Sequence, residues 1–357
     1  MNKQIKRYRV LGLMSGTSLD GLDLCLSDYS LSESQVWKYK IIATKTLGYS
    51  NSWLSFLRNA SKVSGEELIS LHFKYGTFLG ESSRNFLEKK DYSPLLIASH
   101  GHTIFHQPEQ GFTFQLGHPA SIAAGSGFPV VADFRSLDLA LGGQGAPLVP
   151  FGDEYLFSEY SHCFNFGGIC NVSYKNQEGE RIAYDICPFN MVLNYLSQKH
   201  FNRKFDQDGL FSAAGKLNQS LVDRLNQIPY YQKDPPKSLG REWVFSQLIP
   251  IINQYDIPPK DKMRSFCHHI VDQISKVITD KNSHILISGG GAKNKFIIEL
   301  LRRKGVEIQL PSESLIDFKE ALIFGFLGLK RYRREENILS SSTGSKRDSS
   351  SACIYYP

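Results

Sequence analysis

The sequence contains the same short pattern twice: a strand, a turn with glycine, and a second strand. In the first copy, over residues 8–28, every second residue from Leu22 to Leu26 is leucine, which is the two-residue period of a strand. The second copy spans residues 163–174. A turn of small polar residues leaves backbone N–H groups free to bind an anion. The repetition predicts two α/β halves, each opened by a strand, a glycine turn and a strand.

Chain length supports this division. The chain has 357 residues, and a single hydrophobic core stops growing at roughly 250–300 residues. We expect an N-terminal α/β domain over residues 1–140 and a C-terminal α/β domain over residues 141–357. The chain is rich in serine from Ser340 to Ser351, so we expect about the last 18 residues to form a loop or tail.

Composition is that of an ordinary soluble globular protein. Hydrophobic residues account for 41% and charged residues for 21%, which excludes disorder for most of the chain. The formal net charge of +6 is too dilute to predict a nucleic-acid partner. No apolar stretch is long enough for a signal peptide or a membrane span, so no membrane partner is expected. The six cysteines form no C-x-x-C pair, which indicates reduced thiols in a cytoplasmic protein.

Hydrophobic spacing predicts several further elements. A helix capped by Ser64 is expected over residues 65–90. Residues 285–287 read as a buried strand, followed by a helix from about Lys295 to Arg303. Another helix is expected over residues 317–334.

Three glycine turns follow predicted strands, at residues 15–21, 166–171 and 288–294. Glycine lets the backbone approach phosphate oxygens or a base, which a Cβ atom would prevent. One such turn is explained by a tight hairpin alone, but three in one chain indicate a nucleotide site.

Better-known signatures are absent. Gly215 and Lys216 do not form a P-loop, because Leu210 stands where that motif needs a glycine. The run from Gly16 to Asp20 is not a nucleophile elbow, because Asp20 replaces its last glycine. No dinucleotide fingerprint is present either. Nucleotide binding with phosphate held by hairpin turns is the remaining interpretation.

The run Gly12–Asp23, GLMSGTSLDGLD, resembles the N-terminal signature of the anhydro-N-acetylmuramic acid kinases. Further similar motifs follow in order, and the similarity covers nearly the whole chain. They lie at residues 131–135, 142–150, 165–168, 237–242 and 289–294. The resemblance implies the sugar kinase/heat-shock/actin ATPase fold, with ATP in the cleft between two ribonuclease-H-like domains. It also implies a bacterial role in recycling cell-wall sugars, and a homodimer is plausible.

The resemblance implies which residues bind ATP. Those expected at the phosphates are Gly16, Thr17, Ser18, Asp20, Gly21, Asp23, Gly167 and Gly168. Those expected beside adenine and ribose are Gly289, Gly290 and Gly291. Asp20, in the phosphate turn, is expected to act through Mg²⁺ and its waters.

The family reaction joins two chemistries. ATP phosphorylates the sugar 6-oxygen while water opens the 1,6-anhydro ring at the anomeric carbon, so a carboxylate must take a proton from that water. Asp185 is the candidate base. It ends a predicted strand, residues 181–185, before a helix that Pro188 is expected to open, and it matches the family's Asp ahead of Pro-x-Asn. A helix-capping Asp is the alternative.

The sequence departs from the family pattern at this point. Asp-Thr-Gly-Pro-Gly-Asn is expected, whereas Asp185-Ile-Cys-Pro-Phe-Asn190 is found. The loss of both glycines makes the turn bulkier, which could reshape the sugar or phosphate pocket. A kinase of the same fold for a different sugar is therefore an alternative.

Four residues are expected to bind the sugar: Thr103, Arg135, Asn190 and Glu320. A guanidinium at Arg135 suits the lactyl carboxylate of muramic acid, since it donates two parallel hydrogen bonds. An ordinary surface arginine is the alternative there. Glu320 could bind sugar or position its helix.

His100, His102 and His106 raise an alternative of another class, a metal-dependent hydrolase. Strand alternation would place His100 and His102 on one face, as in a metal site. No cysteine or acid stands beside them in ligand spacing, so sugar contact or a packed strand end is the favoured reading. A non-catalytic ATP-binding scaffold is a further alternative.

Overall fold

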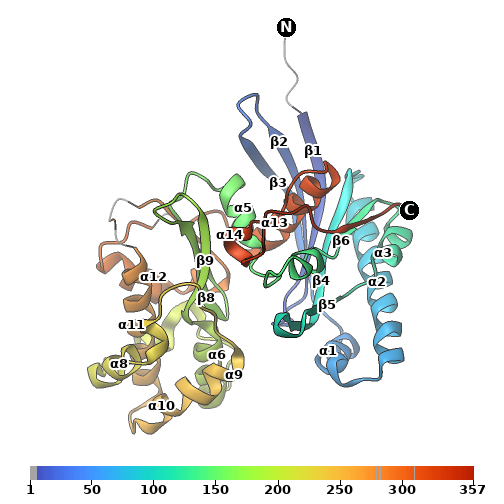
Figure 1. The fold of residues 1–357 in the computed structure, drawn as a ribbon. Helices are drawn as coiled ribbons and strands as arrows, with labels where there is room; N and C mark the ends of the chain where they lie inside the picture. Colours follow the sequence, from blue (N-terminus) through green and yellow to red (C-terminus); the bar gives the residue numbers. More distant parts are fainter. Residues whose placement is uncertain (1–5, 279, 281–282, 309) are drawn as a thin grey trace. The chain divides into compact units, whose positions relative to one another are not determined.

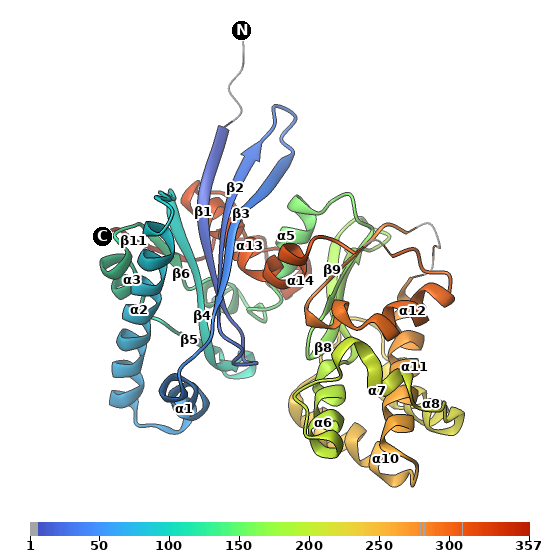
Figure 2. The same ribbon diagram turned by 180° about the vertical axis from the view of Figure 1, so that it is seen from behind.

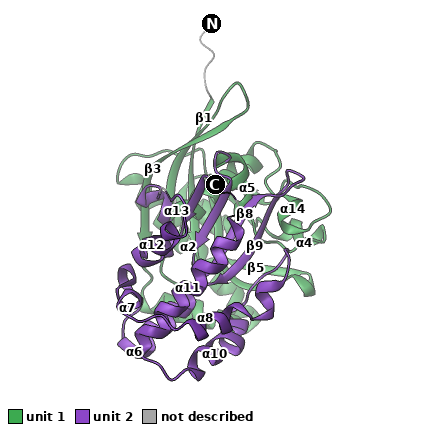
Figure 3. Cartoon of the chain, turned by 90° about the vertical axis from the view of Figure 1, so that its left-hand side faces the viewer, with its two compact units in different colours: residues 1–157, 318–357 green, residues 158–317 purple. Residues whose placement is uncertain are grey.

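The computed structural model describes residues 6–278, 280, 283–308 and 310–357. The chain forms two compact units, coloured separately in Figure 3. Unit 1 comprises residues 1–157 and 318–357, and unit 2 comprises residues 158–317. Residues 1–5, with which the predicted first domain begins, lie outside the described residues. Within the described part, no helix combines the length and the apolar character that a membrane span requires.

Unit 1 contains a seven-stranded sheet of order β11-β6-β4-β1-β2-β3, with β5 paired to β4 (Figure 1). β1, β2 and β3 form an antiparallel meander, β4 pairs parallel with β1, and β6 pairs parallel with β4. The strands are β1 (Lys6–Ser15), β2 (Leu22–Leu31), β3 (Trp37–Leu47), β4 (Leu96–Gln107), β5 (Phe112–Leu116), β6 (Val130–Ala132) and β11 (Cys353–Tyr355).

Helices cover both faces of this sheet (Figures 1 and 2). Leu11 and Leu13 of β1 point into a core shared with α2 and α3. Gly12 lies between them and faces the opposite side, where a Cβ atom would meet the Ala321 carbonyl oxygen of α13 at 1.9 Å. Glycine at this position therefore lets α13 cross β1 closely. The helices are α1 (Asn51–Asn59), α2 (Gly65–Glu88), α3 (Pro119–Ser126), α4 (Ser136–Ala140), α5 (Val149–Leu156), α13 (Glu313–Tyr332) and α14 (Ser340–Thr343); α13 belongs to this unit from Phe318 onward.

Unit 2 contains a four-stranded sheet of order β10-β7-β8-β9. β7, β8 and β9 form an antiparallel meander, and β10 pairs parallel with β7. The strands are β7 (His162–Phe166), β8 (Ile169–Lys175), β9 (Arg181–Pro188) and β10 (Ile285–Ser288). The helices are α6 (Asn190–Phe201), α7 (Leu210–Ala213), α8 (Gln219–Asn226), α9 (Arg241–Trp243), α10 (Ile249–Gln254), α11 (Pro259–Val277) and α12 (Lys295–Arg303).

The two units share one topology. In each, a three-stranded antiparallel meander comes first, and the next strand of the path returns parallel to its first strand after a helical crossover. This is the arrangement expected of ribonuclease-H-like domains. The prediction of two α/β halves, each opened by a strand, a glycine turn and a strand, is confirmed.

The unit boundaries differ from the predicted domains, residues 1–140 and 141–357. α5 remains with unit 1, and the chain returns to unit 1 at Phe318. Two contacts draw the C-terminal part back: α13 crosses β1 at Gly12, and β11 pairs with β6. Such contacts join residues more than 200 positions apart, which local sequence patterns do not reveal.

The last 18 residues are not a tail. They contain α14 and β11, and the side chain of Ser351 is fully buried. Asn337 holds the backbone of Ser351 at both ends: its Nδ2 donates to the Ser351 carbonyl at 2.9 Å, and its Oδ1 accepts from the Ser351 N–H at 2.7 Å. The Asn337 amide satisfies buried backbone groups here, so a polar composition does not indicate exposure.

Pro188 is the last residue of β9, where it pairs with Ile169, and α6 begins at Asn190. The expectation that Pro188 opens the helix is therefore wrong by two residues. The predicted cap of α2 is confirmed, since the Ser64 hydroxyl accepts from the Glu67 N–H at 3.2 Å.

Candidate active site

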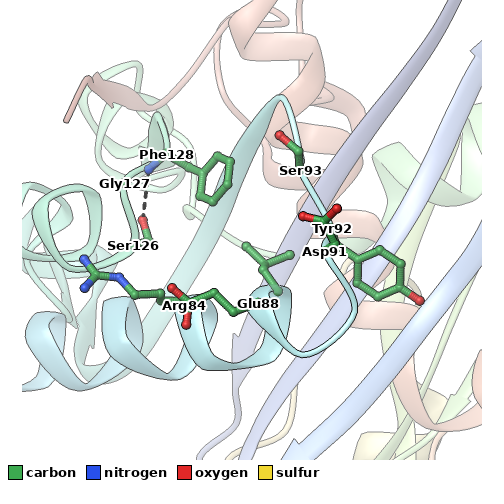
Figure 4. A pocket seen from close by; sticks show the side chains of 9 residues that line it. Arg84, Glu88, Asp91, Tyr92, Ser93, Ser126, Gly127 and Phe128 are labelled. Carbon is green, nitrogen blue, oxygen red and sulfur yellow. Dashed lines mark hydrogen bonds between the residues drawn. The ribbon is translucent and has the colours of Figure 1, made fainter.

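The predicted site residues fall into two groups, one in each unit, and each group is described by itself. A cavity of about 370 Å³ in unit 1 contains none of them (Figure 4). It lies at the end of α2 and is lined by Arg84, Leu87, Glu88, Asp91, Tyr92, Ser93, Ser126, Gly127 and Phe128. We assign this cavity no role in the predicted chemistry, because its lining carries both charges and includes no residue of the glycine turns.

The turn between β1 and β2 presents backbone donors. The Leu19 N–H bonds the Gly16 carbonyl at 3.2 Å, while the N–H groups of Gly16, Thr17 and Ser18 have no acceptor within the described residues. Gly21 is required by the fold, because it has a φ of +153° and a Cβ atom there would meet the Leu47 carbonyl oxygen at 2.7 Å. The turn can therefore bind an anion through its exposed first half.

Two acids flank this turn. Asp20 is exposed and has no hydrogen-bond partner within the described residues. Asp23 instead accepts from the Thr46 hydroxyl at 2.5 Å. Of the two, Asp20 is therefore the one available to a hydrated cation, and Asp23 ties the hairpin to β3.

The turn between β7 and β8 consists of Gly167 and Gly168. Their carbonyls accept from the first N–H groups of α6: Phe189 and Met191 donate to Gly168 at 2.9 and 3.1 Å, and Asn190 donates to Gly167 at 3.2 Å. The N–H groups of the two glycines have no acceptor within the described part of the chain. The carbonyl side of the turn is thus occupied, and its donor side is open.

Neither Gly167 nor Gly168 is required by packing. A Cβ atom at Gly167 would touch its neighbours only at 3.4 Å, one at Gly168 only at 3.8 Å, and neither has a positive φ. A glycine that the fold does not need, beside unused N–H donors, fits close approach of a ligand.

We therefore expect Gly168→Ala to raise the KM for ATP about tenfold while leaving the melting temperature within 1–2 °C of the wild type, on the order of a surface substitution. Steady-state kinetics and calorimetry measure the two quantities. Gly48→Ala is the matched control, because Gly48 also has open space and no positive φ but lies outside the glycine turns. An unchanged KM for ATP in Gly168→Ala would remove this turn from the ATP site.

In the third turn, residues 288–294, the three glycines differ in whether the fold requires them. Gly289 has a φ of +81°, and a Cβ atom there would meet the Asn165 Oδ1 at 2.4 Å. At Gly291 it would meet the Phe189 ring at 2.5 Å. Gly290 has open space around its Cβ position. Packing explains the outer two glycines, and only Gly290 has the freedom expected of a contact with adenine or ribose.

Asp185 lies on β9 and is held by a segment that follows much later in the chain. Its Oδ2 accepts from the Leu239 N–H at 2.9 Å, and its own N–H donates to the Lys237 carbonyl at 3.1 Å. The Tyr230 hydroxyl donates to its backbone carbonyl at 2.6 Å. No described residue bonds Oδ1. The carboxylate is therefore fixed through one oxygen and free at the other.

Burial raises the pKa of Asp185 to about 6, and the Leu239 N–H partly opposes that rise. A carboxylate with this pKa is ionised at neutral pH yet basic enough to accept a proton. The helix-capping alternative is wrong, because Phe189 is the N-cap residue of α6 and no side chain caps that helix.

In unit 1, Arg135 is anchored by two partners. Its Nη1 donates to the Gly145 carbonyl at 2.7 Å, and its Nη2 and Nε donate to the His100 Nε2 at 2.8 and 3.2 Å. His100 is thus neutral, with Nδ1 donating to the Gly101 carbonyl at 3.0 Å. Burial and the Arg135 charge lower the pKa of His100 well below its usual range. An ordinary surface arginine is excluded.

Arg135 retains donors for a ligand. A guanidinium has five N–H groups, and three take part in these bonds, which leaves the two that a bidentate carboxylate contact needs. Glu320 has no hydrogen bond or ion pair within the described residues. Burial raises its pKa, and the charges of Arg135 and Lys319 oppose that rise. Arg135 and Glu320 together supply a donor pair and an acceptor.

Thr103 and Asn190, the other predicted sugar contacts, differ in availability. Thr103 is half-buried on β4 opposite Gln115, and its hydroxyl bonds no described residue. The Asn190 Nδ2 donates to the Phe166 carbonyl at 3.2 Å, which fastens α6 to the β7–β8 turn. The Thr103 hydroxyl is free to bind a ligand, whereas the Asn190 Nδ2 already positions α6 against the β7–β8 turn.

The expectation that His100 and His102 share a strand face is wrong. β4 contains a bulge where it pairs with β1. Ser99 lies opposite Leu13 and His102 opposite Ser15, so β4 advances three residues while β1 advances two. Gly101 makes this bulge possible with a φ of +72°. The extra residue shifts the alternation of the strand.

The three histidines consequently have separate partners. His100 bonds Arg135, His102 bonds the Ser15 hydroxyl through Nδ1 at 2.8 Å, and the exposed His106 lies 3.2 Å from the Thr113 hydroxyl. Burial lowers the pKa of His102 to about 4, so it is neutral. No group of three or more metal-ligating side chains occurs among the described residues. The metal-dependent hydrolase is therefore not supported.

Comparison with known proteins shows the family of this chain. A family model described as anhydro-N-acetylmuramic acid kinase matches residues 8–357. This chain belongs to the anhydro-N-acetylmuramic acid kinase family. Anhydro-N-acetylmuramic acid kinases of Mannheimia succiniciproducens and Pasteurella multocida are each 32% identical to it, over 98% and 97% of this chain and 99% and 96% of theirs. Among solved structures, component A of the (R)-2-hydroxyglutaryl-CoA dehydratase of Acidaminococcus fermentans is 12% identical, with a TM-score of 0.43, over 91% of this chain and 99% of that one.

Three residues that follow Asp185 depart from the pattern of the anhydro-N-acetylmuramic acid kinase family, and they lie in the core of unit 2. Ile186, Cys187 and Phe189 are at most 4% exposed. Phe189 stacks on Phe166 with 4.9 Å between ring centroids. The larger side chains therefore point into the hydrophobic cluster of unit 2.

Sequence reasoning missed several residues that hold the candidate site residues and their neighbours in place. Leu239 and Tyr230 fix Asp185 from 54 and 45 positions away. Ser15 bonds both His102 and the Tyr49 hydroxyl, the latter at 2.6 Å. The motif at residues 237–242 was the available signal for the first contact, but only the fold places it beside β9.

Proposed function

We propose that this chain is an ATP-dependent kinase that opens the 1,6-anhydro ring of 1,6-anhydro-N-acetylmuramic acid and phosphorylates its O6. The product is N-acetylmuramic acid 6-phosphate. The observation that carries the proposal is Asp185, a half-buried carboxylate with a raised pKa, one oxygen held by Leu239 and the other free. Its position matches the family's Asp, in a chain whose relatives are named as kinases of this sugar.

Asp185 acts as the general base in this proposal. Its free oxygen takes a proton from a water, and that water attacks the anomeric carbon on the face opposite the departing O6. The bond between the anomeric carbon and O6 breaks as O6 bonds to the γ-phosphorus of ATP, and the bond from that phosphorus to the departing ADP breaks. O6 therefore needs no separate general acid, because phosphorus takes the place of a proton. The Leu239 N–H holds the carboxylate in one rotamer throughout.

Phosphoryl transfer depends on positioning and charge neutralisation. The open N–H groups of the turns at Gly16 and Gly168 bind phosphate oxygens in this proposal, and Gly290 contacts the adenosine. A Mg²⁺ ion bound with the nucleotide would neutralise its phosphate charge. The exposed carboxylate of Asp20, beside a phosphate-binding turn, fits a hydrated Mg²⁺, which keeps several waters and accepts few protein ligands.

The sugar residues in the proposal are those of unit 1. Arg135 binds the lactyl carboxylate with its two remaining N–H groups, and Glu320 and Thr103 bond the sugar's hydroxyl or acetamido groups. Asn190 positions α6 through the bond from its Nδ2 to the Phe166 carbonyl. The proposal places the enzyme in the cytoplasm, where it recycles cell-wall sugars, and the family resemblance supports a homodimer.

The test is ADP release by the purified protein with Mg²⁺–ATP, in the presence and absence of 1,6-anhydro-N-acetylmuramic acid. We expect release that depends on the sugar, and a product heavier than the sugar by one phosphoryl group and one water in mass spectrometry. 1,6-Anhydro-N-acetylglucosamine, which lacks the lactyl carboxylate, is expected to react poorly. Equal rates with both sugars would contradict the role of Arg135, and no release with any anhydro sugar would contradict the proposed function.

A further inference from the structure

Asp138, close to Arg135 in the sequence, is a buried carboxylate that is not among the predicted site residues. Asp138 is fully buried on α4, three residues after Arg135. Its Oδ2 accepts from the Gly145 N–H at 2.8 Å, and its Oδ1 accepts from the Thr343 hydroxyl at 2.7 Å. Both oxygens of the buried Asp138 carboxylate therefore have a hydrogen-bond donor.

These bonds connect the C-terminal segment to Arg135. The Gly145 carbonyl accepts from the Arg135 Nη1, so both backbone groups of Gly145 are held, one by Arg135 and one by Asp138. Thr343 also accepts through its backbone, from the Gln144 N–H at 2.8 Å. The loop before Gly145 is therefore clamped between α4 and α14.

The C-terminal segment is itself anchored in unit 1. β11 pairs with β6, and the Lys346 N–H donates to the Leu141 carbonyl at 3.2 Å. Gly143 has no room for a side chain, since a Cβ atom would meet the Asp138 Oδ2 at 2.3 Å. The 142–145 loop thus has one packed arrangement, and that arrangement places the carbonyl which orients Arg135.

We propose that Asp138 and Thr343 are positioning residues for the sugar site: they hold the Gly145 carbonyl, which sets the guanidinium of Arg135 for the lactyl carboxylate of the substrate. The inference rests on the proposed function for its substrate. It gives the last residues of the chain a role in sugar affinity without any contact between them and the sugar.

The decisive variant is Thr343→Val, which removes the hydroxyl and keeps the shape. We expect the KM for 1,6-anhydro-N-acetylmuramic acid to rise about tenfold, with kcat and the KM for ATP unchanged. Thr343→Ser restores the hydroxyl and is expected to restore the KM. Ser340→Ala is the matched control, because its hydroxyl bonds Asp348 at 2.7 Å in the same segment and does not touch Asp138.

A double-mutant cycle separates positioning from a general loss of structure. In an Arg135→Lys background, which lacks the planar fork, Thr343→Val is expected to raise the sugar KM no further. A structural role alone predicts additive losses, with kcat and both KM values affected. Additive behaviour, or an unchanged sugar KM in the single variant, overturns the inference.

Nuclear magnetic resonance tests the same link without any sugar. The Arg135 Nε–H bonds His100 and is expected to exchange slowly with water in the wild type, and faster in Thr343→Val but not in Ser340→Ala. Unchanged exchange in Thr343→Val overturns the inference even if the protein acts on another substrate. Absence of sugar-dependent ADP release from a wild type whose Arg135 signal behaves as expected overturns only the proposed function.

Discussion

Asp185→Asn is expected to lower kcat with 1,6-anhydro-N-acetylmuramic acid by a factor of about 10²–10⁴, the usual contribution of a general base. The amide oxygen of asparagine can still accept the Leu239 N–H, so the side chain keeps its place and loses only its basicity. Coupled measurement of ADP release gives the rate. Asp256→Asn, an exposed acid of the same unit, is the control and is expected to be fully active.

The pH dependence provides a second measurement of the same group. Since burial raises the pKa of Asp185 to about 6, the wild-type rate is expected to fall about tenfold per pH unit below that value, as the base becomes protonated. The residual rate of Asp185→Asn lacks this fall. A variant with wild-type activity, or one that retains the acidic limb, would show that another group is the base.

Stability should change in the opposite direction to activity. The folded pKa of about 6 exceeds the ordinary value of 3.8 by about 2 units, so the wild type loses stability relative to Asp185→Asn as pH rises from about 4 through 6. At 1.36 kcal/mol per unit, the variant is expected to be more stable by up to about 3 kcal/mol at pH 7.5 and equal near pH 4. A variant that is both inactive and less stable at pH 7.5 would indicate a structural role for Asp185.

Phe189→Ala is expected to lower the free energy of unfolding by about 3–5 kcal/mol, because it empties a fully buried position in the core of unit 2. It removes the ring that stacks on Phe166 and fills the space beside Gly291. Urea unfolding followed by circular dichroism measures the loss. Phe205→Ala is the matched control, since Phe205 is 57% exposed in the same unit and should cost little.

The sugar preference should survive this substitution wherever the protein remains folded. Phe189 points into the core, so the ratio of kcat/KM for the muramic and glucosamine anhydro sugars is expected to stay within about twofold of the wild type. A changed ratio with little loss of stability would mean that the departure from the family turn shapes the substrate pocket, and would revive a different sugar as substrate.

The strands and glycine turns of the candidate site could be predicted from the sequence, because each depends on a few consecutive residues. The leucine alternation before residue 28 and the glycines of the three turns report backbone geometry, which neighbouring residues impose. Asp185 was singled out by the family motif and by an expected strand end at residue 185, although β9 continues to Pro188. Neither signal needs a residue from elsewhere in the chain.

Other features required contacts between distant residues. The bulge at Gly101 sends His100 to Arg135 and His102 to Ser15, which strand alternation could not foresee. The order of the C-terminal segment depends on its pairing with β6 and on Asp138. Serine-rich composition indicated exposure there, but Ser351 is buried and the Asn337 side chain bonds its backbone.

The sequence by itself determined the two α/β halves, the glycine turns and the identity of the candidate base. The tertiary structure alone decided which glycines the fold requires, which oxygen of Asp185 is free and what holds Arg135. The physical reason is the range of the interactions: backbone conformation and side-chain periodicity are properties of a few consecutive residues, whereas burial, pKa and hydrogen-bond partners depend on chains of contacts that folding brings together.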